Sequence, residues 1–148
     1  MINSPSFRVL LLACAVPLMA GGAEAQSIKK SPQKVMHALA TFPRVVLHTQ
    51  ILIDAKNYAR LPHENQEVKE GAEALHTSLS AETAGFKAKV DPLIETAVAD
   101  SQTLADTAGS GDLGKINAAH DKLAVSVKAL MAAFPASVQP PPPKPPKG

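Results

Sequence analysis

The apolar positions between residues 31 and 134 recur at helical spacing, and the clearest series lies closest to the C-terminus. Between residues 112 and 134, apolar side chains and one histidine alternate at intervals of three and four residues, which is the spacing of one face of an α-helix. These positions are Leu113, Ile116, His120, Leu123, Val127, Leu130 and Phe134. A stripe of this kind packs in a helical bundle, so we predict a helix over 112–134 that Pro135 ends.

A first helical segment is expected to begin after Ser31, a predicted N-cap, with Pro32 at the first helical position. Pro43 lies inside this segment and is expected to kink or interrupt it, because proline has no N–H to donate. The apolar face of the segment consists of Val35, Leu39, Phe42, Val46 and Ile53.

Two more segments lie between these. The second is more polar and is predicted from Glu64 to about residue 80, after a break at residues 61–63. The third is predicted over residues 81–108, where Pro92 either kinks the helix or, with Asp91 as N-cap, starts a new one. Its expected core residues are Phe86, Leu93, Val98 and Leu104.

Four helices joined by short turns predict an all-α fold, an antiparallel up-down-up-down four-helix bundle over residues 31–135. Residues 26–30 would lead into it, and residues 136–148 would form a disordered, proline-rich tail outside the core. Lys144 and Lys147 in that tail could contact anionic polymers or lipid headgroups of an envelope weakly. The sequence leaves open whether the bundle forms a homodimer.

Composition agrees with this class. Hydrophobic residues make up 45% of the 148 residues but aromatic residues only 3%, and there is no Trp. A β-sandwich or barrel would need alternating β-branched and aromatic residues, and no such run occurs.

The first 25 residues are typical of a secretory signal. Arg8 precedes an apolar stretch of about twelve residues, and Ala23-Glu24-Ala25 offers the small residues that a signal peptidase requires. Cleavage before Gln26 would place the protein in the periplasm or outside the cell. In the alternative interpretation, residues 11–14 form a lipoprotein box and Cys14 is acylated.

Removal of this segment restricts the chemistry. Cys14 is the only cysteine, so the mature chain would have no thiol catalysis, zinc finger or iron–sulfur cluster. The net charge stays at +2, because Arg8 and Glu24 are lost together. Lys144 and Lys147 account for that charge, so the bundle itself is near neutral, which argues against nucleic-acid binding.

Residues 126–134, with the Gly111-Asp112 lead-in, resemble the terminal helix of the class II cytochromes c, the family of cytochrome c-prime and its low-spin relatives. In that family the helix carries C-x-x-C-H, which attaches haem through two thioethers and ligates its iron through the histidine. Val127 and Leu130 stand at the two cysteine positions here, and Met131 stands at the histidine position.

The resemblance covers about residues 31–134 and implies an exported four-helix bundle. Met36 stands near the start of the first helix, where low-spin members of the family carry a methionine ligand. The defining motif is absent, so covalent haem is excluded and the redox role of the family does not follow from its fold.

Four side chains are candidates for a cofactor or metal site. Met36 and Met131 should lie at the same end and height of an antiparallel bundle, and together with His37 they could ligate copper or non-covalent haem b. The alternative is that both methionines fill a core poor in aromatics. His120 is the other candidate metal ligand, although its place on the apolar stripe favours a structural histidine bonded to a neighbouring helix.

A run of glutamates is interpreted as a solvated face. Glu64, Glu67, Glu70 and Glu73 repeat every three residues, and Glu73 with His76 has the E-x-x-H spacing of di-metal bundles, but no second such pair occurs. Motifs for a catalytic triad, a phosphate loop or H-E-x-x-H are also absent.

The sequence therefore favours an exported, non-enzymatic binding or interaction protein without cofactor, whose partner would be a protein or a small ligand. The alternative is a copper- or haem-binding electron-transfer protein that uses Met36 and Met131.

Overall fold

The computed structural model of the protein describes residues 28–145. Within that range the chain is all-helical and contains no strand, so the predicted all-α class is confirmed. None of the described helices is long and apolar enough to cross a membrane. The predicted signal segment and Lys147 lie outside the described residues. The helices are α1 (Pro32–Leu39), α2 (Thr41–Asp54), α3 (Leu61–Ser78), α4 (Ala84–Ala108) and α5 (Leu113–Ala132), with the short 3-10 helices η1 (Tyr58–Arg60) and η2 (Ala136–Val138).

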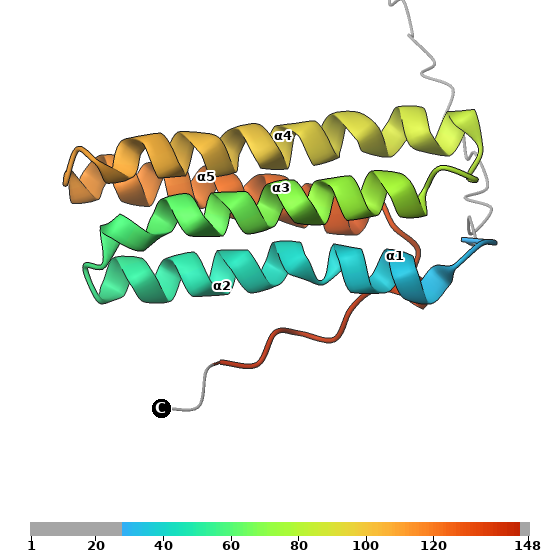
Figure 1. The fold of residues 1–148 in the computed structure, drawn as a ribbon, viewed down its shortest axis with the longest axis horizontal. Helices are drawn as coiled ribbons and strands as arrows, with labels where there is room; N and C mark the ends of the chain where they lie inside the picture. Colours follow the sequence, from blue (N-terminus) through green and yellow to red (C-terminus); the bar gives the residue numbers. More distant parts are fainter. Residues whose placement is uncertain (1–27, 146–148) are drawn as a thin grey trace, which may run out of the picture.

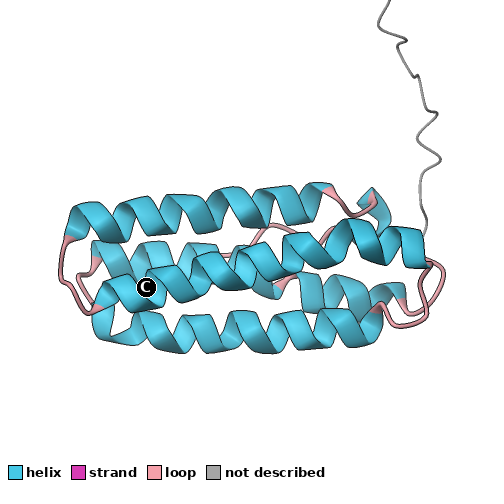
Figure 2. Cartoon of the chain, turned by 90° about the horizontal axis from the view of Figure 1, so that it is seen from above, coloured by secondary structure: helices cyan, strands magenta, loops and turns pink. Residues whose placement is uncertain are grey.

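The helices lie lengthwise beside one another (Figures 1 and 2). α1 and α2 follow each other in line, and α3 packs between α2 and α4. α5 packs against α4 on one side and α2 on the other, so α2, α3, α4 and α5 form a closed ring of neighbours. A single hydrophobic cluster runs through the middle of this ring.

The first predicted segment is interrupted, as expected from Pro43. α1 ends at Leu39 and α2 begins at Thr41, because the proline has no N–H for the carbonyl of Leu39 and its ring crowds that carbonyl. Pro32 occupies the first helical position as predicted. Ser31 is the N-cap residue, as predicted, with a positive φ of 52°, and its side chain makes no capping hydrogen bond.

Two other helix starts differ from the expectation. α3 begins at Leu61, since Pro62 lies in the first turn, where the missing N–H would have no helical partner anyway. α4 begins three residues later than predicted, after Thr83, whose hydroxyl accepts a hydrogen bond from the Phe86 N–H at 3.3 Å. Pro92 lies inside α4 and does not start a new helix.

Most predicted core positions are buried, with instructive exceptions. Leu113 is 47% exposed, because it is the first residue of α5 and lies beyond the packed turns. Val46 is only partly buried and Val45 is buried in its place, because the break at Ala40 changes the phase of α2 relative to α1. On α4, Leu93 and Val98 lie at the edge of the core, whereas the unpredicted Ile94 is fully buried.

The chain after Pro135 does not leave the bundle where the sequence suggested. Val138 in η2 is fully buried, and η2 packs against α1. The Gln139 side-chain amide donates to the carbonyls of Met131 at 2.6 Å and Phe134 at 3.0 Å. Met131 lies in the last turn of α5 and Phe134 lies just beyond its C-cap, Ala133, so Gln139 binds the chain back to the end of this helix. The packed domain therefore extends to Gln139, not to residue 135.

We expect Val138→Ala to lower the free energy of unfolding by about 2 kcal/mol, from lost apolar burial and the cavity left behind. Urea unfolding followed by circular dichroism would measure it. The neighbouring Ser137→Ala, at an exposed position, is the control and should change stability by less than about 0.5 kcal/mol. Equal, small effects of both substitutions would show that the tail is detached in solution.

Candidate functional site

The structure gives Met36 and Met131 the environment of core side chains. Met36 on α1 and Met131 on α5 are both partly buried and pack against the hydrophobic cluster. The Met131 carbonyl accepts a hydrogen bond from the Gln139 side-chain amide. A methionine at the edge of a core poor in aromatics fills irregular space through its flexible chain, and that filling role accounts for both residues.

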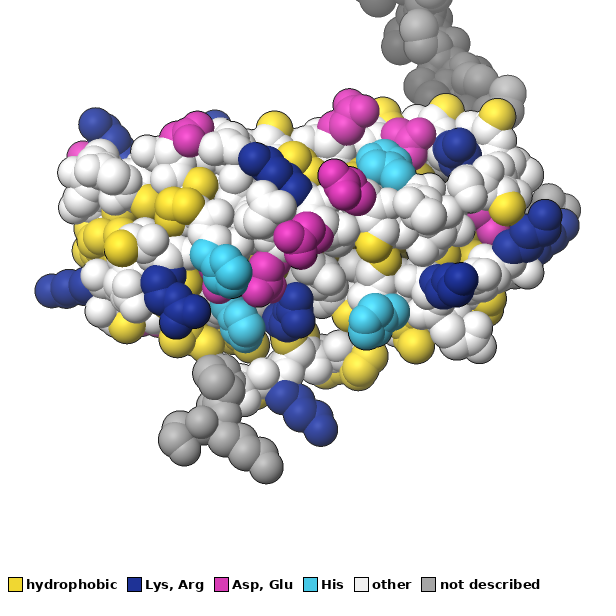
Figure 3. Space-filling view, in the orientation of Figure 1, with side chains coloured by type: hydrophobic (Ala, Val, Ile, Leu, Met, Phe, Trp, Pro, Cys, Tyr) yellow, Lys and Arg dark blue, Asp and Glu magenta, His cyan; other side chains and the backbone are white. Residues whose placement is uncertain are grey.

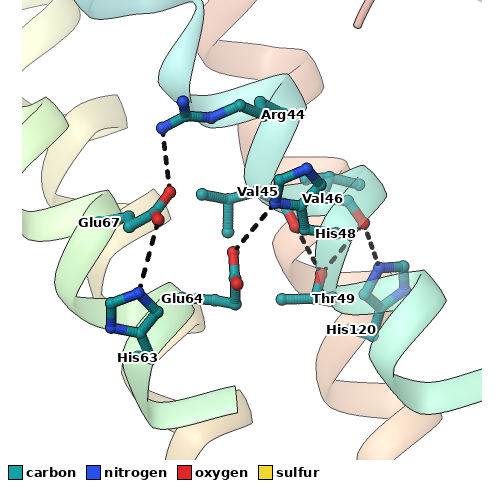
Figure 4. A network of polar contacts seen from close by, with 9 residues as sticks. All are labelled: Arg44, Val45, Val46, His48, Thr49, His63, Glu64, Glu67 and His120. Atoms are coloured by element: carbon teal, nitrogen blue, oxygen red, sulfur yellow. Dashed lines mark hydrogen bonds and ion pairs between the residues drawn. The ribbon is translucent and has the colours of Figure 1, made fainter. Parts of the chain in front are cut away.

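The two candidate histidines are in different environments. His37 on α1 is exposed. His120 on α5 is 6% exposed, and its Nε2 lies 3.0 Å from the Val46 carbonyl oxygen on α2 (Figure 4). His120 therefore ties α5 to α2, which is the structural role considered for it. Among the described residues, no group of three or more His, Cys, Asp or Glu side chains is placed to hold a metal ion.

A polar cluster between α2 and α3 is the feature that the sequence did not predict. Figure 3 shows acidic and histidine side chains gathered in a band across this face of the molecule. Figure 4 shows that several of them point from α2 and α3 toward one another. The members are Arg44 and His48 on α2, and His63, Glu64 and Glu67 on α3.

Glu64 is the buried member of this cluster, with only 5% of its surface exposed. It lies one turn after Leu61 and one turn before Val68, both fully buried, so it belongs to the core-facing stripe of α3. Steps of three residues lag the helix by about 60° each. The later glutamates therefore rotate outward, and Glu70 and Glu73 are exposed. The expected solvated face is correct for those two and wrong for Glu64.

The two buried or half-buried carboxylates differ in how their oxygens are partnered. Glu67 Oε2 accepts a hydrogen bond from Arg44 at 2.9 Å, and its Oε1 lies 3.7 Å from His63 Nε2. Glu64 Oε2 accepts no hydrogen bond in the described structure. His48 Nδ1 lies 3.7 Å from this oxygen. Glu64 Oε2 can therefore still accept a hydrogen bond, whereas Glu67 Oε2 already accepts one.

Burial raises the pKa of the Glu64 carboxyl above its usual range, and the neighbouring Glu67 charge raises that pKa further. His48, His63 and Arg60 oppose the shift. A positively charged or hydrogen-bond-donating group placed against this carboxyl would stabilise its ionised form.

A hollow of about 240 Å³ lies beside Glu64, which is one of its lining residues. We call it the Glu64 site and define it by its lining residues, His48, Ile51, Leu52, Arg60 and Glu64. It combines an unsatisfied buried acceptor, an exposed guanidinium and an aliphatic wall, which is the composition of a small-ligand site.

A larger, shallower groove lies between α3 and α4, but none of its lining side chains has a buried polar atom without a partner in the described structure. Gln102 Oε1 accepts from both Asn65 Nδ2 at 2.9 Å and Lys69 Nζ at 2.8 Å, and the Gln102 amide donates to Asp106 at 2.8 Å. Gln102 therefore holds α3 to α4, and the Glu64 site is the stronger candidate for binding.

The raised Glu64 pKa makes stability depend on pH. The folded state keeps the proton at pH values where the unfolded chain has lost it, so stability declines as pH rises from about 4.3 through the folded pKa. We expect Glu64→Gln to match the parent below that range and to be more stable near neutral pH by about 1 kcal/mol. Urea unfolding between pH 4 and 8 measures the difference.

Glu70→Gln is the matched control for this prediction, since Glu70 is exposed on the same helix. Glu70→Gln should change the free energy of unfolding only slightly, and this change should vary little with pH. A Glu64→Gln protein that is less stable than the parent at neutral pH would show instead that the ionised carboxylate makes a net favourable contact with His48.

Comparison of the chain with protein-family models, with curated proteins and with solved structures finds no match in any of the three.

Proposed function

We propose that the protein is an exported, non-enzymatic binding protein, built as an antiparallel up-down-up-down four-helix bundle of the class II cytochrome c type without covalent haem. Pairing across the α2–α3 interface supports the antiparallel arrangement, because each step forward along α2 is a step back along α3. The pairs are Thr41 with Gly71, Arg44 with Glu67, and His48 with Glu64. The α3–α4 interface follows the same rule in its polar pairs, Asn65 with Gln102 and His76 with Asp91.

The observation that carries the binding role is the state of Glu64. A buried carboxylate oxygen without a hydrogen-bond donor costs folding free energy, and the residue that carries it is one of those lining a hollow. Bundles place their ligand sites between facing helices, as α2 and α3 are here. We propose that the site takes a small molecule with a cationic, hydrogen-bond-donating group.

Isothermal titration calorimetry with 3-methylbutylamine tests this role, because the probe joins an ammonium group to a short branched aliphatic chain. We expect saturable binding to the protein, weakened at least about tenfold by Glu64→Gln, the loss typical of a hydrogen bond to a charged group. Glu70→Gln removes the same charge from an exposed position of α3 and should leave the affinity unchanged. Binding that is insensitive to Glu64→Gln would overturn the proposed site.

The copper or haem b alternative is tested on the same preparation. We expect the purified protein to be colourless and free of stoichiometric copper, because the positions of Met36 and Met131 are explained by core packing. Absorption spectroscopy and elemental analysis measure this. A Soret band, or bound copper that falls on Met36→Leu or Met131→Leu, would replace our proposal with the electron-transfer alternative.

A further inference from the structure

We infer that the Glu64 site binds an α-amino acid with an aliphatic side chain, with the ligand's ammonium against Glu64, its carboxylate against Arg60 and its side chain on Ile51 and Leu52. This inference rests on the proposed binding function and names the ligand class for the same site.

The charges of the site match those of a zwitterion. Glu64 and Arg60 both line the hollow, and Arg60 lies one turn before Glu64, at the N-cap of α3. Arg60 is exposed and forms no ion pair with another residue of the described range. A guanidinium without a partner binds a carboxylate in two parallel hydrogen bonds. A simple amine would leave Arg60 unused.

The rest of the lining selects the side chain. Ile51 and Leu52, near the end of α2, are partly exposed and form the apolar wall of the hollow. Apolar contact there adds affinity in proportion to the buried methylene groups. Glycine, which has no side chain, would leave this wall in water.

The hollow is small, with a volume of about 240 Å³, which suits a small ligand. Several aliphatic amino acids are of suitable size, so the inference names the class and uses leucine as its probe.

The test is a calorimetric series of four probes on the purified protein. Leucine is the full ligand, 3-methylbutylamine lacks its carboxylate, 4-methylpentanoate lacks its ammonium, and glycine lacks its side chain. We expect leucine to bind about tenfold or more tightly than each of the others, because each lacks one of the three contacts.

Two charge-neutralising variants and two controls complete the test. Arg60→Gln should weaken leucine about tenfold and leave 3-methylbutylamine unchanged, whereas Glu64→Gln should weaken both. Lys122→Gln and Glu70→Gln remove the same charges at exposed positions and should change neither affinity. Circular dichroism of each variant confirms that it is folded.

The outcomes separate the inference from the proposed function. Equal affinity for leucine and the amine, or leucine binding that is insensitive to Arg60→Gln, would overturn the amino-acid inference while the Glu64 binding role stands. Failure of both leucine and the amine to bind would overturn both.

Discussion

Phe42→Ala is expected to lower the free energy of unfolding by about 4 kcal/mol, since truncating a fully buried aromatic ring loses its apolar burial and leaves a cavity. Phe42 has no exposed surface and is the largest of the fully buried side chains. Stabilities of small domains lie near 5–15 kcal/mol, so this one substitution would remove a large share of the total. The thermal midpoint should fall by roughly 15 °C.

The scarcity of aromatics makes this position unusually important. The sequence has four phenylalanines, and the three in the described range are all buried. Two of these, Phe86 and Phe134, pack edge to face with ring centroids 5.5 Å apart. Phe42 instead lies in the first turn of α2, directly after the break at Ala40. Helical hydrogen bonds constrain the chain direction least at this break. The burial of Phe42 therefore holds the start of α2 against the core.

Chemical denaturation followed by circular dichroism measures the effect. Val125→Ala is the control, because Val125 is 68% exposed and its truncation should change stability by less than about 0.5 kcal/mol. A Phe42→Ala protein within about 1 kcal/mol of the parent would contradict the buried position of this ring.

The helices could be predicted from the sequence because their signals are local. Helix α5 follows an uninterrupted three-four repeat, and Asp112 supplies its cap by accepting from the Lys115 N–H at 3.1 Å. Pro43 marks the α1–α2 break by chemistry that needs no tertiary context. Val138 shows the limit of this reasoning, because one valine among prolines has no periodicity and only the packing against α1 shows its burial.

The Glu64 site is only partly predictable from the sequence. The break expected at residues 61–63 places Glu64 in the first turn of the helix, where an acidic residue is favourable. In the structure α3 begins at Leu61, and Glu64 lies one turn from both Leu61 and Val68 on its buried stripe. A charged residue in phase with a core stripe is the signal that could have revealed it. Arg60 is the N-cap residue of α3, four residues before Glu64, so the start of α3 at Leu61 also places Arg60 one turn from Glu64.

Gly71→Leu is expected to lower the free energy of unfolding by about 3 kcal/mol, because the new side chain has no room at the α1–α2 junction. A Cβ atom at Gly71 would lie 2.9 Å from Thr41 Cγ2 and 3.0 Å from Thr41 Cβ. The glycine weakens α3 intrinsically, by about 1 kcal/mol relative to alanine. In return, Gly71 lets α2 approach α3 closely, and this close approach is its contribution to the fold.

The same approach positions the Glu64 site. Moving from Gly71 back along α3, the next turns reach Glu67, paired with Arg44, and Glu64, paired with His48. Pushing the helices apart at Gly71 should lengthen both pairs and open the hollow. We therefore expect Gly71→Leu to weaken probe binding as well as stability, including at temperatures where circular dichroism shows the protein to be folded.

A double-mutant cycle isolates the contact with Thr41. Gly71→Ala alone combines a gain in helix propensity with the cost of the clash. Thr41→Ser removes the nearer of the two contacting atoms, Cγ2, and keeps Cβ. In the Thr41→Ser background, Gly71→Ala should therefore stabilise the protein by about 1 kcal/mol more than it does in the parent. Urea unfolding of the four proteins measures this coupling. Equal effects of Gly71→Ala in both backgrounds would show that α2 and α3 lie further apart than the structure places them.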